Sequence, residues 1–132
     1  MKLAILLFLF TCSAFAASQD VRVIDGDTVN VPMSLVAGMP NRVSVRLLGV
    51  NTPEMHGKCA AEKQKAQVAK AFVQGKFDKA QSVKIEYVHW DKYARVDGKV
   101  TLDGNDLAAD LIKAGLGVAY SGGKRDPLMW CK

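Results

Sequence analysis

Apolar and polar residues alternate along the chain after residue 20, which is the pattern of half-buried β-strands. Valines occupy every second position on both sides of a turn that contains the segment IDGDT, and the alternation returns in residues 42–48 (RVSVRLL). We predict a hairpin over residues 21–31, ended by Pro32, and a third strand over residues 42–48. Three strands therefore precede any helix.

Between residues 60 and 77 the spacing of apolar residues changes from every second position to the spacing of one helix face. The apolar side of this predicted helix contains Ala61, Val68, Ala69, Phe72, Val73 and Phe77. The opposite, polar side contains Glu62, Lys63, Lys65 and Lys70. We predict that the helix ends near Gly75, because glycine is common just past a helix terminus.

The remainder of the chain predicts two more strands and a short helix. A fourth strand over residues 83–87 and a fifth over residues 96–102 again show alternation. Asn105 or Asp106 then caps a helix that ends before Gly115. This order of elements favours a five-stranded, partly open α+β barrel of the oligonucleotide/oligosaccharide-binding (OB-fold) type, although an antiparallel α+β sandwich fits the same pattern.

The first sixteen residues, MKLAILLFLFTCSAFA, have the composition of a secretory signal peptide. They contain one lysine, an apolar run, and small residues before a predicted cleavage point between Ala16 and Ala17. A membrane anchor is the alternative, but the apolar run is shorter than the roughly 20 residues that a spanning helix needs. We therefore predict a signal peptide over residues 1–16 and one domain over residues 17–132. The protein is expected to be exported, periplasmic or secreted, with no stable membrane insertion.

Removal of the signal peptide would take Cys12 with it, so the mature domain keeps two cysteines, Cys59 and Cys131. An even pair of cysteines in an oxidising compartment predicts a disulfide. Two ligands of a metal ion are the alternative, but the chain has no CxxC spacing.

Charge and motif content narrow the possible chemistry. The formal net charge is +5 and falls by one when Lys2 leaves with the signal peptide. This charge supports weak, salt-sensitive attraction to nucleic acid or to an anionic membrane. The chain contains neither a GxSxG nucleophile motif nor a GxxxxGK phosphate-binding loop.

Acidic and basic residues gather at the first turn (Asp25 and Asp27), over residues 46–54, and over residues 91–95. Each cluster taken alone fits an ordinary turn or a solvated strand. Together they supply what phosphodiester cleavage requires. Carboxylates can hold a hard divalent cation and position a water, and arginines on strands can bind phosphate oxygens and stabilise the transition state.

Three of these segments, VIDGDT, RLLGVNTPE and DKYAR, carry a resemblance to the staphylococcal nuclease (thermonuclease) family. They occur in the order and at about the spacing seen in that family, and the resemblance runs from about residue 21 to residue 120. The family consists of secreted or exported enzymes built on an OB-type barrel. The resemblance therefore implies a metal-dependent nuclease.

The resemblance also implies a calcium site and a phosphate clamp. Asp27 is similar to a calcium-ligating aspartate, Thr52 to a residue that binds the metal through its backbone carbonyl, and Glu54 to the glutamate that orients or activates the attacking water. Arg46 and Arg95 resemble the two arginines that clamp the scissile phosphate.

Further matches concern the surroundings of the metal and the substrate. Asp25 resembles an acidic neighbour of the metal. Lys92 and Tyr93 resemble residues that contact a terminal phosphate of the substrate. Tyr120 resembles a tyrosine that stacks on a base, with a gap of one residue in the match.

Asn51 departs from the family, because the best-known member has a calcium-ligating aspartate at this position. An asparagine oxygen can still coordinate a hard cation, but the lost charge should weaken the site. We expect an active enzyme with a lower calcium affinity. A catalytically weak or silent OB-type module that binds nucleic acid is the alternative.

The tail after Tyr120 is a second departure, because the best-known member continues into a third helix. We predict that the Cys59–Cys131 disulfide ties this short tail to the loop after Glu54. The expected activity is hydrolysis of DNA and RNA with low sequence specificity, leaving 3′-phosphate ends. Single-stranded or locally open substrates are expected to be favoured, and the protein is expected to act as a monomer.

Overall fold

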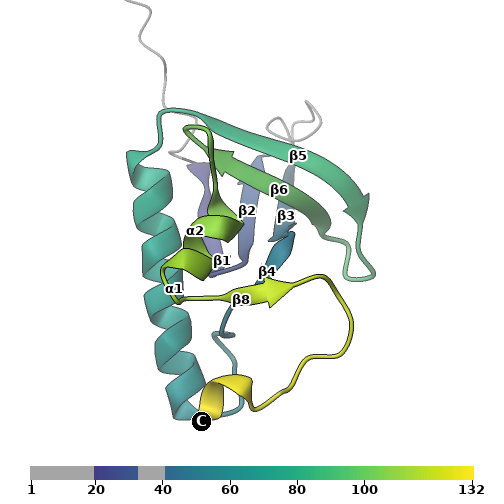
Figure 1. Ribbon diagram of the computed structural model, residues 1–132. Helices are drawn as coiled ribbons and strands as arrows, with labels where there is room; N and C mark the ends of the chain where they lie inside the picture. Colours follow the sequence, from purple (N-terminus) through teal and green to yellow (C-terminus); the bar gives the residue numbers. More distant parts are fainter. Residues whose placement is uncertain (1–19, 33–40) are drawn as a thin grey trace, which may run out of the picture.

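The computed structural model describes residues 20–32 and 41–132, so the predicted signal peptide lies outside the described residues. Five strands form the main sheet in the order β1-β2-β3-β6-β5, with β7 beside β6, while β4 and β8 pair separately (Figure 1). The strands are β1 (Arg22–Asp25), β2 (Thr28–Pro32), β3 (Arg42–Leu47), β4 (Gly49–Asn51), β5 (Val83–Trp90), β6 (Val96–Leu102), β7 (Asn105–Asp106) and β8 (Val118–Tyr120). The helices are α1 (Ala60–Lys79), α2 (Leu107–Lys113) and the 3-10 helix η3 (Met129–Cys131).

The first three strands follow the predicted pattern closely. β1 and β2 form the predicted hairpin, and β2 pairs antiparallel with β3. Buried and less buried residues alternate along β3, with Val43, Val45 and Leu47 turned inward. β3 then pairs in parallel with β6, where Val45 lies opposite Val96, so strands distant in sequence meet in the core.

Two Asp-Gly pairs form turns for different physical reasons. Asp103 and Gly104 have φ values of 49° and 83°, so glycine suits the left-handed backbone of the turn between β6 and β7. Gly26 is not in that conformation. A Cβ at Gly26 would lie 2.8 Å from Thr52 Oγ1 and 2.9 Å from the Cβ of Ala69, so here glycine is required by close packing.

Helix α1 differs from its prediction in two respects. It continues past Gly75 to Lys79, because Phe77 is fully buried and its packing outweighs the unfavourable helix propensity of glycine, about 1 kcal/mol. The predicted faces are also partly wrong. Val68 is 56% exposed, whereas Glu62, predicted on the polar side, is buried.

The fourth predicted strand is longer than the pattern indicates. β5 extends to Trp90, and Tyr87, predicted to share a face with Ile85, is 49% exposed. Figure 1 shows this end of the β5–β6 hairpin extending away from the helices. The pairing of β5 with β6 also shifts register between Tyr87 and His89, so alternation does not predict burial at this end of β5.

The short elements around the site were not predicted, with the exception of α2 and its cap. Gly49, with φ of 85°, lets the chain turn from β3 into β4. Strand β4 then pairs with β8, and Asn51 lies opposite Val118. Asp106 caps α2 by accepting a hydrogen bond from Ala108 N, which confirms one of the two predicted caps.

The architecture confirms the predicted α+β fold of the OB type. The sheet is partly open, since no strand ladder in residues 20–32 and 41–132 joins β1 to β5. Helix α1 packs against β1, and α2 packs against β4 and β6. Among the described residues, no helix is both long enough and apolar enough to cross a membrane.

Candidate active site

Asp27 is the buried centre of the predicted metal site, with only 5% of its surface exposed. Its Oδ2 accepts a hydrogen bond from Thr52 N at 2.9 Å and lies 3.4 Å from Arg46 Nη2. Its Oδ1 accepts a hydrogen bond from Thr28 Oγ1 at 3.2 Å. The turn after β1 is thereby joined to β3 and to the segment after β4, so three of the predicted residues meet at one carboxylate.

Asp25 lies beside Asp27 and accepts a hydrogen bond from its backbone N at 3.3 Å. Burial, the negative charge of Asp27 and a side-chain hydrogen bond to Asp27 together raise the pKa of Asp25 from 3.8 to about 7. Removal of water from around a carboxylate, and a second negative charge beside it, both produce such a shift.

The residues around Asp27 fit a hard divalent cation by their chemistry. The donors are all oxygens, from Asp25, Asp27, Asn51 and Thr52, and such ligands suit calcium or magnesium. Thr52 Oγ1 is in addition buried without a hydrogen-bond partner among the described residues. The carboxylate repulsion at Asp25 and this unpartnered hydroxyl both fit a cation at this place.

Arg46 projects from β3 and is held by the sheet itself. Its Nη1 donates to the carbonyl oxygens of Leu47 at 2.6 Å and Val50 at 2.9 Å, while Nη2 faces Asp27. The side chain is only 12% exposed. Its conformation is therefore fixed before any ligand arrives, which favours a role in orienting a bound phosphate.

Arg95 lies at the end of the tight turn that precedes β6. Its Nε donates to Asp91 Oδ2 at 2.8 Å, and the Asp91 carboxylate also accepts backbone hydrogen bonds from Arg95 and Tyr93. Burial acts to raise the pKa of Asp91, but the hydrogen bonds from Arg95 and Tyr93 outweigh it and hold this pKa below its usual value. Lys92 Nζ and Arg95 Cζ lie 5.1 Å and 5.3 Å from the centre of the Tyr93 ring.

The predicted site residues line two open hollows in the surface. The larger hollow, about 600 Å³, is lined by residues that include Arg46, Lys92, Tyr93, Arg95 and Tyr120. The smaller hollow, about 340 Å³, is lined by residues that include Asn51, Thr52 and Glu54. Asp25 and Asp27 line neither hollow. Asp27 instead contacts Arg46, which lines the larger hollow, and Thr52, which lines the smaller one.

Arg125 connects the two hollows, and it is the one residue of the described chain that lines both. Its Nη1 donates to Asn51 Oδ1 at 2.8 Å and lies 3.1 Å from Glu54 Oε1. Its guanidinium lies 5.9 Å from the centre of the Tyr120 ring. Sequence reasoning missed this residue, because the predicted disulfide fixed only the end of the tail and gave no path for residues 121–130.

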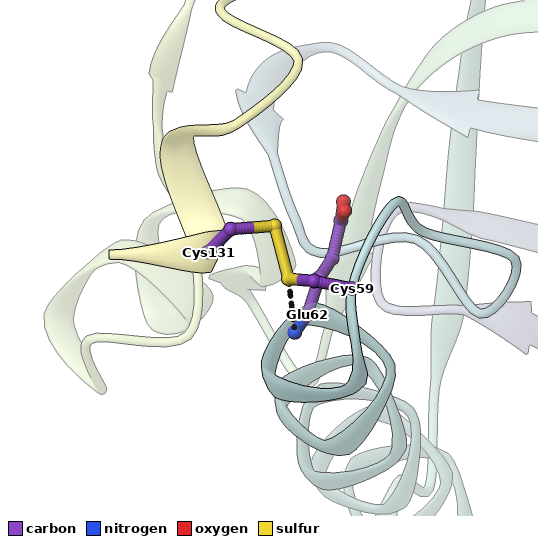
Figure 2. A group of neighbouring side chains, drawn as sticks. All are labelled: Cys59, Glu62 and Cys131. Carbon is purple, nitrogen blue, oxygen red and sulfur yellow. Dashed lines mark hydrogen bonds between the residues drawn. A yellow bond between two sulfur atoms is a disulfide. The ribbon is translucent and has the colours of Figure 1, made fainter.

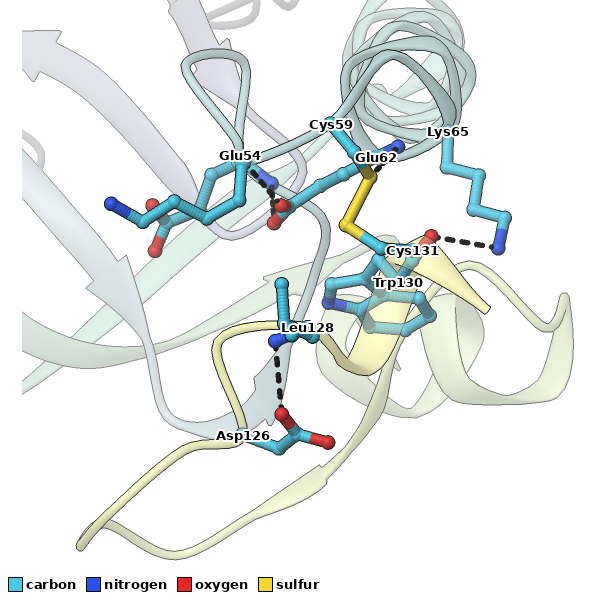
Figure 3. Close-up of a disulfide and its surroundings, with 9 residues drawn as sticks. Glu54, Cys59, Glu62, Lys65, Asp126, Leu128, Trp130 and Cys131 are labelled. Atoms are coloured by element: carbon cyan, nitrogen blue, oxygen red, sulfur yellow. Dashed lines mark hydrogen bonds between the residues drawn. A yellow bond between two sulfur atoms is a disulfide. The ribbon is translucent and has the colours of Figure 1, made fainter.

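Glu54 is positioned through Glu62, the buried acid at the start of α1. Glu62 accepts hydrogen bonds from Glu54 N at 3.3 Å and Lys58 N at 2.8 Å (Figure 3). Gly57 lies so close to this carboxylate that any Cβ there would overlap it. Sequence reasoning missed Glu62 as well, although the spacing Cys59-x-x-Glu62 is that of a helix capping box.

The disulfide between Cys59 and Cys131, predicted from the sequence, is present in the structure, with the two Cα atoms 6.0 Å apart. Cys59 Sγ also accepts a hydrogen bond from Glu62 N (Figure 2). Cys59, Cys131 and Glu62 form a close group of potential metal-binding residues. The sulfurs are bonded to each other and offer no thiolate, so the alternative that these cysteines bind a metal is wrong.

Comparison with known proteins supports the family resemblance predicted from the sequence motifs. A sequence model of the family described as staphylococcal nuclease homologue matches residues 44–127, well over half of the chain. The match contains Arg46, Glu54, Arg95 and Arg125, whereas Asp25 and Asp27 precede it. A search among curated proteins found no match. The family match contains the motifs RLLGVNTPE and DKYAR, whereas VIDGDT precedes it. The match confirms the family resemblance: the chain belongs to the staphylococcal nuclease family, whose members are generally nucleases that bind nucleic acids.

Proposed function

We propose that the protein is an exported, metal-dependent nuclease that hydrolyses DNA and RNA with low sequence specificity. The observation that carries this proposal is the buried carboxylate of Asp27, which contacts both Arg46 and the backbone of Thr52. The buried Asp27 and the partly buried Asp25, beside an arginine that lines an open hollow, supply acidic and basic groups at one place. Both groups are needed to cleave a phosphodiester.

The metal ligands in this proposal are Asp25, Asp27, Asn51 and the Thr52 carbonyl, and the metal is Ca²⁺ or a similar hard cation. When bound, the cation supplies positive charge that stabilises the negative charge developing on the phosphate. Asn51 Oδ1 already accepts a hydrogen bond from Arg125, so its contribution to the metal is expected to be weaker than that of a carboxylate.

Side chains of the protein carry out the proton transfer and bind the phosphate. Glu54 accepts a proton from the attacking water, and Arg46 and Arg95 bind the non-bridging oxygens of the phosphate. The water oxygen bonds to phosphorus while the bond from phosphorus to the 5′ oxygen breaks. The 5′ oxygen takes up a proton from solvent and leaves as a hydroxyl, and the phosphate stays on the 3′ end. Lys92 and Tyr93 contact a neighbouring phosphate.

The substrate preference follows from the kinds of contact available in the larger hollow. Arginine and lysine bind phosphate, and the rings of Tyr93 and Tyr120 offer faces on which any base can stack. Such contacts carry little sequence information, and stacking requires bases that are not paired. The proposal therefore favours single-stranded or locally open DNA and RNA, bound by a monomer.

A second candidate function is a nucleic-acid-binding module without turnover. The pairing of Glu54 with Arg125 favours it, because an ion pair at this glutamate competes with its role as a base. Neutral Asn51 in place of a carboxylate points in the same direction.

One experiment decides between these functions. The exported protein, with its disulfide formed, is incubated with single-stranded DNA, double-stranded DNA and RNA, with chelator or with Ca²⁺, Mg²⁺ or Mn²⁺. We expect cleavage only with a metal, and Glu54→Gln should lower kcat by about 100-fold or more while binding in chelator is retained. Binding without cleavage under every metal would overturn the enzyme and support the binding module. Phosphatase treatment of the products identifies their ends.

A further inference from the structure

The tail residue Arg125 has contacts that the proposed mechanism does not use. Its Nη1 makes both polar contacts, one with the Asn51 amide oxygen and one with the Glu54 carboxylate. In the part of the chain that the structure describes, no hydrogen bond is formed by its Nε or Nη2. Arginine presents five N–H groups in a planar fork, so most of this donor capacity remains available to a ligand.

Among the described residues, Arg125 is the one shared by the smaller hollow, which contains Glu54, and the larger hollow, which contains Arg46 and Arg95. Its side chain is 42% exposed, in contrast to 12% for Arg46, so it can be reached by a strand lying across both hollows. Its guanidinium also faces the ring of Tyr120.

Neutral Asn51 explains why this guanidinium can be released to a substrate. An arginine between two carboxylates would be held by two charged partners, whereas Arg125 has one charged partner, the half-exposed Glu54. Half-exposed ion pairs contribute little free energy in water. A phosphate oxygen can therefore replace these contacts at small cost.

The disulfide places Arg125 over the site. Cys131 lies six positions after Arg125 in the sequence and is bonded to Cys59 at the start of α1. Lys65 Nζ of the same helix donates to the carbonyl oxygen of Trp130 at 3.1 Å, and Asp126 accepts a hydrogen bond from Leu128 N at 2.9 Å (Figure 3). The tail thus returns to the helix that also positions Glu54.

From these contacts we propose that Arg125 is a third phosphate-binding arginine of the site, held in place by the Cys59–Cys131 disulfide. Its ligand is a phosphodiester group of the bound strand at the boundary between the two hollows. The proposal rests on the proposed function, since it names a further residue that binds the same class of substrate. The pairing with Glu54 and Asn51 is the arrangement of the free enzyme.

Arg125→Gln tests the proposal, with Lys124→Gln as a matched control that removes the same charge from the neighbouring position. Binding of single-stranded DNA is measured in chelator over a range of salt concentrations. Arg125→Gln should reduce the slope of log affinity against log salt by about 0.7, the value expected for one lost phosphate contact, and Lys124→Gln should change it much less. In the presence of metal, kcat/KM should fall by about 10- to 100-fold only in Arg125→Gln.

Two further variants separate binding from structure. Arg125→Lys keeps the charge but not the fork, so it should recover the salt slope and only part of kcat/KM. Cys59→Ser/Cys131→Ser should lose at least as much kcat/KM as Arg125→Gln, because the disulfide also supports the segment that carries Glu54. Adding Arg125→Gln to it should cause little further loss. Circular dichroism confirms that each variant is folded.

The outcomes distinguish this proposal from the proposed function. If wild-type protein binds and cleaves while Arg125→Gln matches it in slope and kcat/KM, the role of Arg125 is overturned and the nuclease stands. Equal losses in Arg125→Gln and Lys124→Gln would also overturn it, because they would show a general charge effect. If wild-type protein neither binds nor cleaves nucleic acid, both proposals fall.

Discussion

The candidate site has two halves that are held in different ways. The barrel half, Asp25, Asp27, Arg46 and Arg95, lies on the strands or on the turns next to them. The loop half, Glu54 and Arg125, lies on the segment after β4 and on the tail. Asp27 and Arg46 are almost fully buried, whereas the side chains of Glu54 and Arg125 are 50% and 42% exposed.

The two halves differ in what holds their side chains in position. The barrel half is fixed when the sheet forms, since its groups bond to strand carbonyls and to backbone N–H groups. The loop half depends on one buried acid, Glu62, and on one disulfide, both at the start of α1. Loss of the disulfide should therefore disturb the loop half and leave the barrel half in place.

The largest expected effect comes from removing the disulfide. Cys59→Ser/Cys131→Ser breaks a link between residues 72 positions apart, and we expect a loss of roughly 4 kcal/mol in the free energy of unfolding. The melting temperature should fall by at least several degrees. Thermal unfolding measures the loss, and calorimetric calcium titration should show an affinity within about twofold of wild type.

Reduced wild-type protein serves as the control and should melt at the temperature of the double serine variant. An unchanged melting temperature would show that the tail is held by its other contacts. A large loss of calcium affinity would show that the two halves are not independent.

The second largest effect is expected for Arg46 in the barrel half, compared with Arg125 in the loop half. Replacing Arg46 should lower the free energy of unfolding by about 3 kcal/mol. Arg46→Gln leaves Asp27 buried without its cation, so it should lower both kcat, by about 100- to 1,000-fold, and the free energy of unfolding. Arg125→Gln should lower stability by less than about 1 kcal/mol, because its ion pair is half exposed. Urea unfolding and cleavage rates of both variants give the comparison. Equal losses of stability would contradict the division into halves.

The smallest effect concerns how ionisation of Asp25 changes the stability of the metal-free protein. Asp25 has a pKa of about 7 in the folded protein against 3.8 in the unfolded chain, so the folded state binds this proton more tightly. The stability that the proton contributes is complete below about pH 3.8 and is lost as the pH rises through 7. Asp25→Asn avoids this loss and should stabilise the chelated protein by roughly 2 kcal/mol at about pH 8 and very little at about pH 4.

Asp103→Asn is a control for which we expect the opposite change in stability to that of Asp25→Asn. Hydrogen bonds from Ser82, chiefly from its backbone N–H, lower the pKa of Asp103. This ionised carboxylate therefore contributes stability at neutral pH. Replacement of Asp103 should therefore destabilise the protein at about pH 8. Urea unfolding in chelator measures both variants, and a destabilised Asp25→Asn at about pH 8 would contradict the repulsion between the two aspartates.

Local rules predicted the regular parts of the fold and failed where packing decides. The alternation in β3 and the cap at Asp106 follow from side-chain direction and from backbone hydrogen bonding, which are local properties. The end of α1 was misjudged because burial of Phe77 overrides the preference of Gly75. The strands β4 and β8 are three residues each, too short to show a period.

The sequence by itself determined the order of the main strands and helices, the family, and the predicted pairing of the two cysteines, because these follow from local periodicity, motif order and cysteine count. Only the tertiary structure decided which carboxylate meets which arginine. The pairing of Glu54 with Arg125 joins residues 71 positions apart in the sequence. Such a contact depends on the path of the whole chain, which here is fixed at its end by the Cys59–Cys131 disulfide.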